Sequence, residues 1–266
     1  MNLLLVGCGK MGGALLKGWA RHAGAYAIAI VDPVHSLSNV PKETGVLWFK
    51  SPDDLPNSYS PTATVIAVKP QHMDTVLPIY ARYGESVFLS IAAGRTLNSL
   101  AALLGNGKHA IVRAMPNLPA SIGMGITAAV ANENVAPSQH KLCDSLLQGA
   151  GDVVWLENEK MIDAVTALSG CGPAYLFALT ETMAAAGAKL GLPSETAMRL
   201  ARQTIAGSGA LLAQSLESPA ALRQAVASPG GTTEAALKIL LAEDGLPGLM
   251  LRAMEAAAAR AKELAS

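Results

Sequence analysis

A glycine-rich turn close to the start of the chain constrains its fold more than any other segment. Gly7, Gly9 and Gly12 follow the apolar run Asn2 to Val6 and open a helix-like stretch. In a turn of this spacing the first glycine permits a tight bend, the second lets the backbone approach a pyrophosphate, and the third lets helix and strand pack. Three glycines alone are a weak signal, but the strand, the helix and a second strand accompany them here. We expect these residues to contact a dinucleotide: Gly7, Gly9, Lys10, Met11 and Gly12.

An acidic residue, Asp32, ends the second predicted strand. Its position there affects which dinucleotide can bind. Asp32 lies twenty residues beyond the last glycine of the turn. A carboxylate there accepts hydrogen bonds from the adenosine ribose and repels a 2′-phosphate, which favours NADH. Alternatively, Asp32 and Pro33 only open a turn, and His35, Ser36 and Ser38 hold a phosphate. Both NADPH and NADH therefore stay candidates.

Up to residue 157, short apolar runs alternate with helix-like stretches. This alternation is typical of crossover units and predicts an α/β fold with a doubly wound, mainly parallel sheet. We therefore expect a Rossmann-like dinucleotide-binding domain over residues 1–157. The predicted strands are Asn2 to Val6, Tyr26 to Val31, Gly45 to Phe49, Ala63 to Val68, Ser86 to Ser90, Ala110 to Ala114, Gly125 to Ala131 and Asp152 to Leu156.

After Glu157 the chain is rich in alanine, leucine and methionine, which predicts an all-helical domain over residues 158–266. Glycine and proline predict the breaks between its helices, which are Gly170 to Pro173, Gly191 to Pro193, Pro219, Pro229 to Gly231 and Gly245 to Gly248. Two buried helical stripes are expected from spacings of three and four. They are Leu176, Leu179, Met183, Ala186 and Leu190, and Met198, Ala201, Ile205, Gly209 and Leu212. The helix beginning near Ala174 is apolar almost all round and has to be covered on several sides. We expect a second subunit to cover it; the alternative is the Rossmann-like domain of the same chain.

Charge, hydropathy and cysteine content argue against several classes. The charges of twenty basic and twenty acidic side chains cancel, so we expect neither nucleic acid nor an anionic membrane as a partner. No uninterrupted apolar run approaches the ~18 to 20 residues of a membrane-spanning helix, and no leader is evident at the N-terminus. Three cysteines without metal-type spacing indicate a reducing compartment and no metal site. We expect a cytoplasmic protein.

Three further clusters lie where such a sheet or its helices place ligands. Val68 to Gln71 follows the fourth strand, so Lys69 is either functional or the start of a helix. Ser169 to Tyr175 separates two helices, and Cys171 is expected to pack rather than to act as a nucleophile. Ser228 to Thr233 precedes an amphipathic helix and predicts an anion site suited to a carboxylate; the alternative is an ordinary capped loop.

These clusters, taken together, resemble the bacterial pyrroline-5-carboxylate reductases over nearly the whole chain. The matching motifs are Gly7 to Gly12, Ala67-Val68-Lys69-Pro70-Gln71, Ser90-Ile91-Ala92-Ala93-Gly94, Arg113-Ala114-Met115-Pro116-Asn117, the segment Asp163 to Tyr175, and Ser228 to Thr233. The resemblance implies reduction of Δ1-pyrroline-5-carboxylate by NADPH or NADH to L-proline, the last step of its biosynthesis. It also implies a homodimer with interleaved helical domains, often assembled into a larger ring.

The resemblance assigns residues to this reaction. The substrate carboxylate is expected at Ser228, Gly230, Gly231 and Thr232, and the catalytic hydroxyl of Thr233 is expected at the ring nitrogen. For the cofactor we expect contacts from Ala67, Val68, Lys69, Pro70, Ala92 and Asn117, in addition to Asp32, which is expected there from its position after the second strand. Two departures are visible, since family members commonly have serine in place of Cys171 and a small or basic residue in place of Asp32.

Two other functions are compatible with the same architecture. A β-hydroxyacid dehydrogenase also joins a Rossmann-like domain to a helical domain, but it needs a catalytic lysine on a helix of the second domain. Lys189 is the candidate, although it stands just before Gly191-Leu192-Pro193 and lacks the expected glycine-rich surroundings. A non-catalytic redox sensor would use the same dinucleotide site without turnover.

Overall fold

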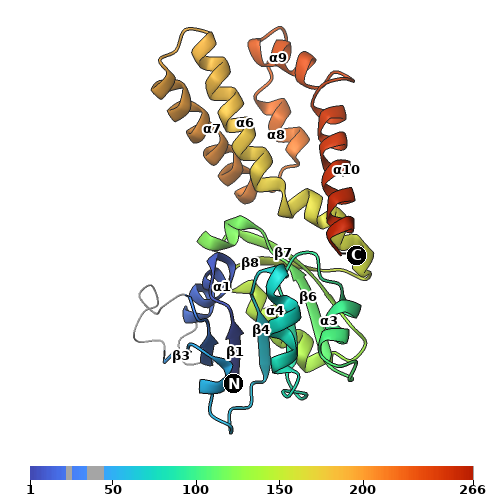
Figure 1. Ribbon diagram of the computed structural model, residues 1–266. Coiled ribbons are helices and arrows are strands. Elements are labelled where there is room, and N and C mark those ends of the chain that lie inside the picture. Colours follow the sequence, from blue (N-terminus) through green and yellow to red (C-terminus); the bar gives the residue numbers. More distant parts are fainter. Residues whose placement is uncertain (22–25, 35–44, 266) are drawn as a thin grey trace. The chain divides into compact units, whose positions relative to one another are not determined.

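The computed structural model describes residues 1–21, 26–34 and 45–265 and forms two compact units (Figure 1). Unit 1 comprises Met1–Gly170 with Ala258–Ser266, and unit 2 comprises Cys171–Ala257. The three residues considered as phosphate ligands, His35, Ser36 and Ser38, lie outside the described residues. The domain boundary expected after residue 157 stays a prediction, and the helical segment that follows it up to Gly170 belongs to unit 1.

Unit 1 is built on an eight-stranded sheet, which confirms the predicted fold class. The strand order is β3-β2-β1-β4-β5-β6-β7-β8, and every neighbouring pair is parallel except β6 and β7. The strands are β1 (Asn2–Val6), β2 (Ala27–Val31), β3 (Leu47–Phe49), β4 (Ala63–Ile66), β5 (Val87–Ser90), β6 (Ala110–Met115), β7 (Gly125–Ala131) and β8 (Gly151–Trp155). The chain order reverses beside β1, where doubly wound sheets bind ligands.

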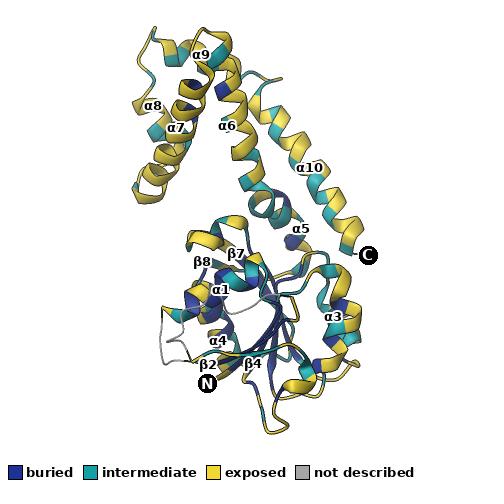
Figure 2. Cartoon of the chain, turned by 60° about the vertical axis from the view of Figure 1, so that its left-hand side comes forward, coloured by how far each residue is buried: buried dark blue, intermediate teal, exposed yellow. Residues whose placement is uncertain are grey.

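Both faces of this sheet are buried, because consecutive side chains of a strand point to opposite faces. In β1, Leu3 and Leu5 join the core cluster formed with α1 (Lys10–Ala20) and α4 (Pro137–Gln148). Leu4 and Val6 join a second cluster with the segments that follow β4 and β5. Figure 2 shows the strands as the most deeply buried part of unit 1.

The remaining helical segments of unit 1 are short. Four follow the strands of the first half: η3 (Pro52–Asp54), η4 (Pro70–His72), α2 (Met73–Val76) and η5 (Leu77–Tyr80). The others are α3 (Leu97–Leu103), η6 (Leu118–Ile122), η7 (Glu159–Met161), α5 (Ile162–Val165) and the π-helical segment η8 (Thr166–Gly170). A π-helical turn within a helix is rare and occurs often at functional sites; it was not predicted.

Unit 2 consists of helices, as predicted for this part of the chain. They are α6 (Gly172–Lys189), α7 (Ser194–Gln214), α8 (Pro219–Ala225), α9 (Thr232–Leu240) and α10 (Leu246–Ala265), whose last turns belong to unit 1. Proline stands in the first turn of α6 and α8, where its missing N–H costs nothing. The sequence therefore located the breaks between these helices correctly.

The prediction of two buried stripes is wrong for the single chain. In the first stripe Leu176 is 51% exposed and Leu190 is 87% exposed, and in the second only Ala201 is buried. Figure 2 shows the helices of unit 2 as mostly exposed. The spacing identified apolar faces, but a spacing of three and four does not specify which chain covers them.

One continuous helical stretch, Glu159–Lys189, is long and apolar enough to cross a membrane by length and composition alone. Its most apolar window has a mean hydropathy of 1.3 and is 11% buried. Exposed apolar surface on this scale marks an interaction site in a folded protein.

Candidate functional site

The glycine turn has the geometry that a dinucleotide site requires. Gly7 adopts a φ of +87°, a backbone conformation that residues with a side chain rarely adopt. Its amide donates to the Val31 carbonyl oxygen at 2.9 Å. A Cβ at Gly12 would lie 2.4 Å from the Gly7 carbonyl oxygen. Gly9 stands at the N-cap of α1, and a Cβ there would meet nothing within 4 Å. The turn is closed on the strand side and open at Gly9, where a pyrophosphate would approach the helix N-terminus.

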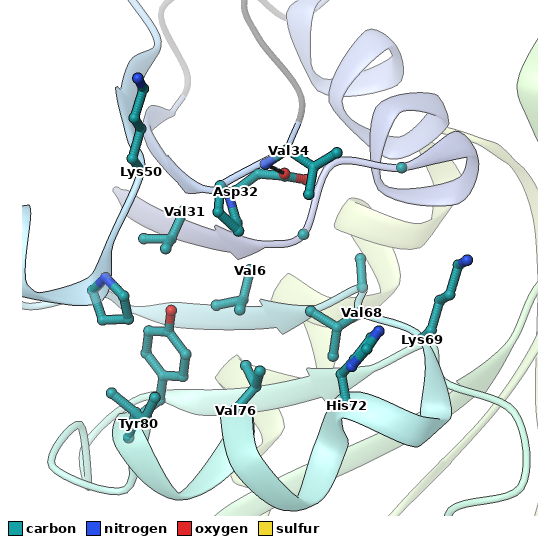
Figure 3. Close-up of a pocket in the computed structure, with 16 residues that line it drawn as sticks. Val6, Val31, Asp32, Val34, Lys50, Val68, Lys69, His72, Val76 and Tyr80 are labelled. Carbon is teal, nitrogen blue, oxygen red and sulfur yellow. Dashed lines mark hydrogen bonds between the residues drawn. The ribbon is translucent and has the colours of Figure 1, made fainter.

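A cavity of about 530 Å³ opens beside this turn (Figure 3), within the range of roughly 300–1,000 Å³ typical of small-molecule sites. Six residues predicted to bind the cofactor line it: Gly7, Gly9, Asp32, Ala67, Val68 and Lys69. The walls are mainly apolar, with Val6, Val31 and Val76 among them. The structure therefore brings the segments after β1, β2 and β4 together around one space.

Sequence reasoning missed the polar residues that complete this lining. Lys50 follows β3, His72 ends η4 and Tyr80 ends η5. No motif marks them, because each comes from a separate segment and only the sheet order brings them together. Only the position of Lys50 in the chain could have indicated its place in the lining, because Lys50 follows the strand that pairs in parallel with β2.

The Asp32 carboxylate accepts hydrogen bonds from two backbone amides. Its Oδ2 accepts a hydrogen bond from the Cys8 amide at 2.6 Å, and its Oδ1 accepts one from the Val34 amide at 2.8 Å. The bond to Val34 is the turn-opening arrangement considered from sequence. The bond to Cys8 shows a further role, because it ties the end of β2 to the glycine turn.

The surroundings of Cys8 change the pKa of its thiol. Burial, and secondly the negative charge of Asp32, raise the pKa of Cys8 to about 11. The side chain is therefore a neutral thiol near pH 7, and it packs rather than reacts.

The turn after β4 is held in place by an arginine from the turn after β5. Arg95 Nη2 donates to the Pro70 carbonyl oxygen at 2.9 Å, and Nη1 donates to Asp74 Oδ1 at 2.7 Å. Pro70 itself begins η4 and is outside the cavity lining, next to the lining residue Lys69. Arg95 thereby fixes the backbone that carries Lys69.

The other expected cofactor residues lie outside the cavity lining. Lys10, Met11 and Gly12 form the first turn of α1. Ala92 is 4% exposed and belongs to the core cluster beyond β5. Asn117 Nδ2 donates to the Ser169 carbonyl oxygen at 3.2 Å. Two sequence motifs far apart in the chain thus meet at this bond, which the spacing alone did not predict.

The Ser228 to Thr233 loop lies in unit 2 and joins α8 to α9. The Gly231 amide donates to the Ser228 carbonyl oxygen at 2.9 Å, and the Gly230 amide donates to the Glu234 carboxylate. Gly230 adopts φ +71° and Gly231 is the N-cap of α9. Thr232 and Thr233 begin α9, where amides lack partners inside the helix. The loop thus presents a helix N-terminus and hydroxyl side chains, the features expected for binding a carboxylate.

Among the residues that the structure describes, no group of three or more His, Cys, Asp or Glu side chains is arranged to hold a metal ion. Cys171 precedes α6 at its N-cap position and is half-buried. Lys189 is the last residue of α6.

Comparison with known proteins shows which family has a similar sequence and a similar fold. Residues 159–264 match the family model described as pyrroline-5-carboxylate reductase dimerisation. A pyrroline-5-carboxylate reductase of Pseudomonas aeruginosa is 45% identical over 76% of this chain and 74% of its own length. The structure of the enzyme from Coxiella burnetii superposes with a TM-score of 0.90, at 34% identity, covering 100% of this chain and 98% of the other. That of Plasmodium falciparum, solved with NADP bound, has a TM-score of 0.81 at 29% identity, with coverage of 100% and 98%.

Proposed function

The chain belongs to the pyrroline-5-carboxylate reductase family, and from this premise we propose that it reduces Δ1-pyrroline-5-carboxylate to L-proline with NADPH or NADH. This reaction is the last step of proline biosynthesis. The observation that carries the proposal is the cavity at the glycine turn, because a reductase of this family needs a dinucleotide site and Gly9 leaves open the approach to a helix N-terminus.

The chain's own residues have mainly to bind and orient. A bound nicotinamide supplies a hydride, for which a protonated cyclic imine is already a good acceptor. The protein therefore gains most from holding the two reactants in register and excluding water. In unit 1 this task falls to the glycine turn, together with Asp32 and the segment from Ala67 to Pro70.

In unit 2 we assign the substrate to the loop before α9. The carboxylate binds at the Gly231 and Thr232 amides and the Ser228 hydroxyl, and the Thr233 hydroxyl meets the ring nitrogen. Gly230 and Gly231 shape the loop. In the structure the Gly231 amide donates to the Ser228 carbonyl oxygen. When this amide binds the substrate carboxylate, the new hydrogen bond replaces that internal one.

We further propose a homodimer, in larger assemblies a ring of dimers, located in the cytoplasm. Support for the dimer comes from α6, where Leu176 and Phe177 are 51% and 57% exposed in the single chain. The family model that covers this helix is described as a dimerisation region. A second subunit covering this face would also account for the apolar stretch Glu159–Lys189 without a membrane. The free cysteines Cys8, Cys143 and Cys171 fit a reducing compartment.

The test is turnover of the purified protein. We expect NADH or NADPH to be oxidised when pyrroline-5-carboxylate is added, with proline as product. Oxidation of a β-hydroxyacid without any turnover of pyrroline-5-carboxylate would favour the dehydrogenase alternative. Dinucleotide binding without turnover of either substrate would favour the redox sensor.

A further inference from the structure

The side chain of Tyr80 lies against the cavity beside the glycine turn, and its hydroxyl has no hydrogen-bond partner among the described residues. Tyr80 is 0% exposed, belongs to the core cluster of α2 and α3, and lines the cavity. Its hydroxyl makes no hydrogen bond with any residue that the structure describes. Figure 3 shows the hydroxyl directed into the space between Val6 and Val31. Buried polar groups are nearly always paired, so the Tyr80 hydroxyl requires a partner other than the residues that the structure describes.

We propose that the Tyr80 hydroxyl hydrogen-bonds the edge of the adenine base of the bound dinucleotide. This inference rests on the proposed function in that it takes the cavity to be the dinucleotide site. Adenine has flat apolar faces and an edge that carries ring-nitrogen acceptors and an amino donor. The cavity offers matching surfaces, with Val31 and Val76 for the faces and the Tyr80 hydroxyl for the edge.

The position of Tyr80 within the cavity agrees with this assignment. The pyrophosphate end is set by Gly7 and Gly9, and the adjacent end of β2 carries Asp32, which suits the ribose. Tyr80 comes from η5, at the far end of the helical segment that starts beside Lys69. A base attached to that ribose would extend along the apolar walls toward the hydroxyl.

The chemical state of Tyr80 suits an edge contact. Burial raises the pKa of Tyr80 far above its ordinary value, so the hydroxyl stays protonated and can both donate and accept. The ring is held by packing in the core and stacks on Tyr83 at a centroid distance of 6.4 Å. A rigid side chain loses little conformational freedom when it binds, so its hydroxyl can discriminate between ligands.

The variant Tyr80→Phe tests the assignment, because it removes only the hydroxyl. Binding is measured by direct titration of the full-length protein, without substrate, with NADH and with reduced nicotinamide mononucleotide, which lacks the adenosine half. We expect NADH to bind about threefold to tenfold more weakly to the variant, as for loss of one neutral hydrogen bond, and the mononucleotide to bind unchanged. Tyr83→Phe is the matched control, since Tyr83 does not line the cavity, and it should leave both affinities unchanged.

A second readout excludes a folding artefact. Without ligand, Tyr80→Phe should melt at the same temperature as the natural protein or higher, because an unpaired buried hydroxyl is removed. Unchanged NADH affinity would overturn the proposal and indicate that a water molecule satisfies the hydroxyl. Equal weakening for NADH and the mononucleotide would also overturn it. These experiments measure binding and melting and do not measure turnover. A failure of the proposed reductase activity would therefore be detected independently, in the turnover assay.

Discussion

The carboxylate of Asp32 accepts a hydrogen bond from the backbone amide of Cys8 at 2.6 Å, which joins the end of β2 to the glycine turn after β1. The same side chain accepts from the Val34 amide at 2.8 Å and is only 4% exposed. Asp32 therefore supports the glycine turn, and we propose that the same carboxylate also repels a 2′-phosphate on the adenosine ribose. Sequence reasoning treated the turn role and the ribose role as alternatives, whereas the geometry allows one side chain to have both.

Replacing Asp32 by serine should separate these two roles. Loss of the charge should raise the ratio of kcat/KM for NADPH to that for NADH by about tenfold, or ~1.4 kcal/mol. Loss of two charge-assisted bonds to backbone amides should lower the free energy of unfolding by about 1–3 kcal/mol. Steady-state kinetics and urea unfolding measure the two effects. Asp53→Ser, at an exposed carboxylate in η3, is the control, and an unchanged cofactor ratio in Asp32→Ser would leave Asp32 with the turn role alone.

Two adjacent glycines of α1 offer a matched pair of substitutions. Gly12→Ala should abolish dinucleotide binding or prevent folding, because its Cβ would lie 2.4 Å from the Gly7 carbonyl oxygen. Gly13→Ala should be tolerated and stabilise the helix by roughly 0.5–1 kcal/mol, since its Cβ would meet only the Cys8 carbonyl oxygen, at 3.9 Å. NADH titration and thermal unfolding of both variants give the comparison. Equal behaviour of the two variants would contradict the close approach at Gly12.

Thr233→Ala should lower kcat/KM for pyrroline-5-carboxylate by about fivefold, or ~1 kcal/mol, because one hydrogen bond to the ring nitrogen is lost. Cofactor affinity should stay unchanged, since we assign Thr233 to the substrate and it does not line the cavity at the glycine turn. Thr62→Ala, at an exposed threonine of unit 1, controls for loss of a threonine elsewhere. Wild-type kcat/KM in Thr233→Ala would remove this residue from the substrate site.

Phe177→Glu should convert the dimer to monomers, because it places a charge on the apolar face of α6 that we assign to the subunit interface. Light scattering coupled to size exclusion measures the mass directly. Leu47→Glu is a control matched in exposure, since Leu47 is 55% and Phe177 57% exposed in the single chain. A Phe177→Glu protein that stays dimeric would place the interface elsewhere.

Alkaline pH should destabilise the fold through its buried thiols. The pKa of Cys8 is raised from 9.0 to about 11 and that of Cys143 to about 12, in both cases mainly by burial. The folded state thus keeps protons that the unfolded chain loses, so this contribution to stability is complete below pH 9 and is lost as pH rises toward 11 and 12. Cys8→Ala should reduce the slope of unfolding free energy against pH over this window. The free energy of unfolding of the variant at pH 7 is the baseline. An unchanged slope of unfolding free energy against pH would show that Cys8 does not contribute to the loss of stability.

Local pattern was sufficient for the elements of this protein. All eight strands lie where apolar runs predicted them, with ends that differ by a few residues. The predicted strand Ala63 to Val68, for example, ends at Ile66, and the next two residues, Ala67 and Val68, line the cavity. The breaks around Pro173, Pro193 and Pro219 also separate the observed helices. Such features depend on neighbours in sequence, which is why they can be read without a fold.

Contacts between distant segments were beyond the same reasoning. Lys50, His72 and Tyr80 join the cavity only because the sheet order places their segments around β1. The Asn117 side chain bonds to the Ser169 carbonyl oxygen across two motifs that the sequence presents separately. The apolar stripes of α6 and α7 were identified, but the sequence pattern did not show that most of their residues are exposed in the single chain.

The amino-acid sequence by itself determined the glycine turn, the strand and helix order and the family, because spacing, propensity and motif are local properties of the chain. Tertiary structure alone decided that the Asp32 carboxylate supports the glycine turn and that the Tyr80 hydroxyl is buried without a partner in the described part of the chain. Both facts depend on which groups the folded backbone brings within hydrogen-bond distance, and no pattern along the chain specifies those distances.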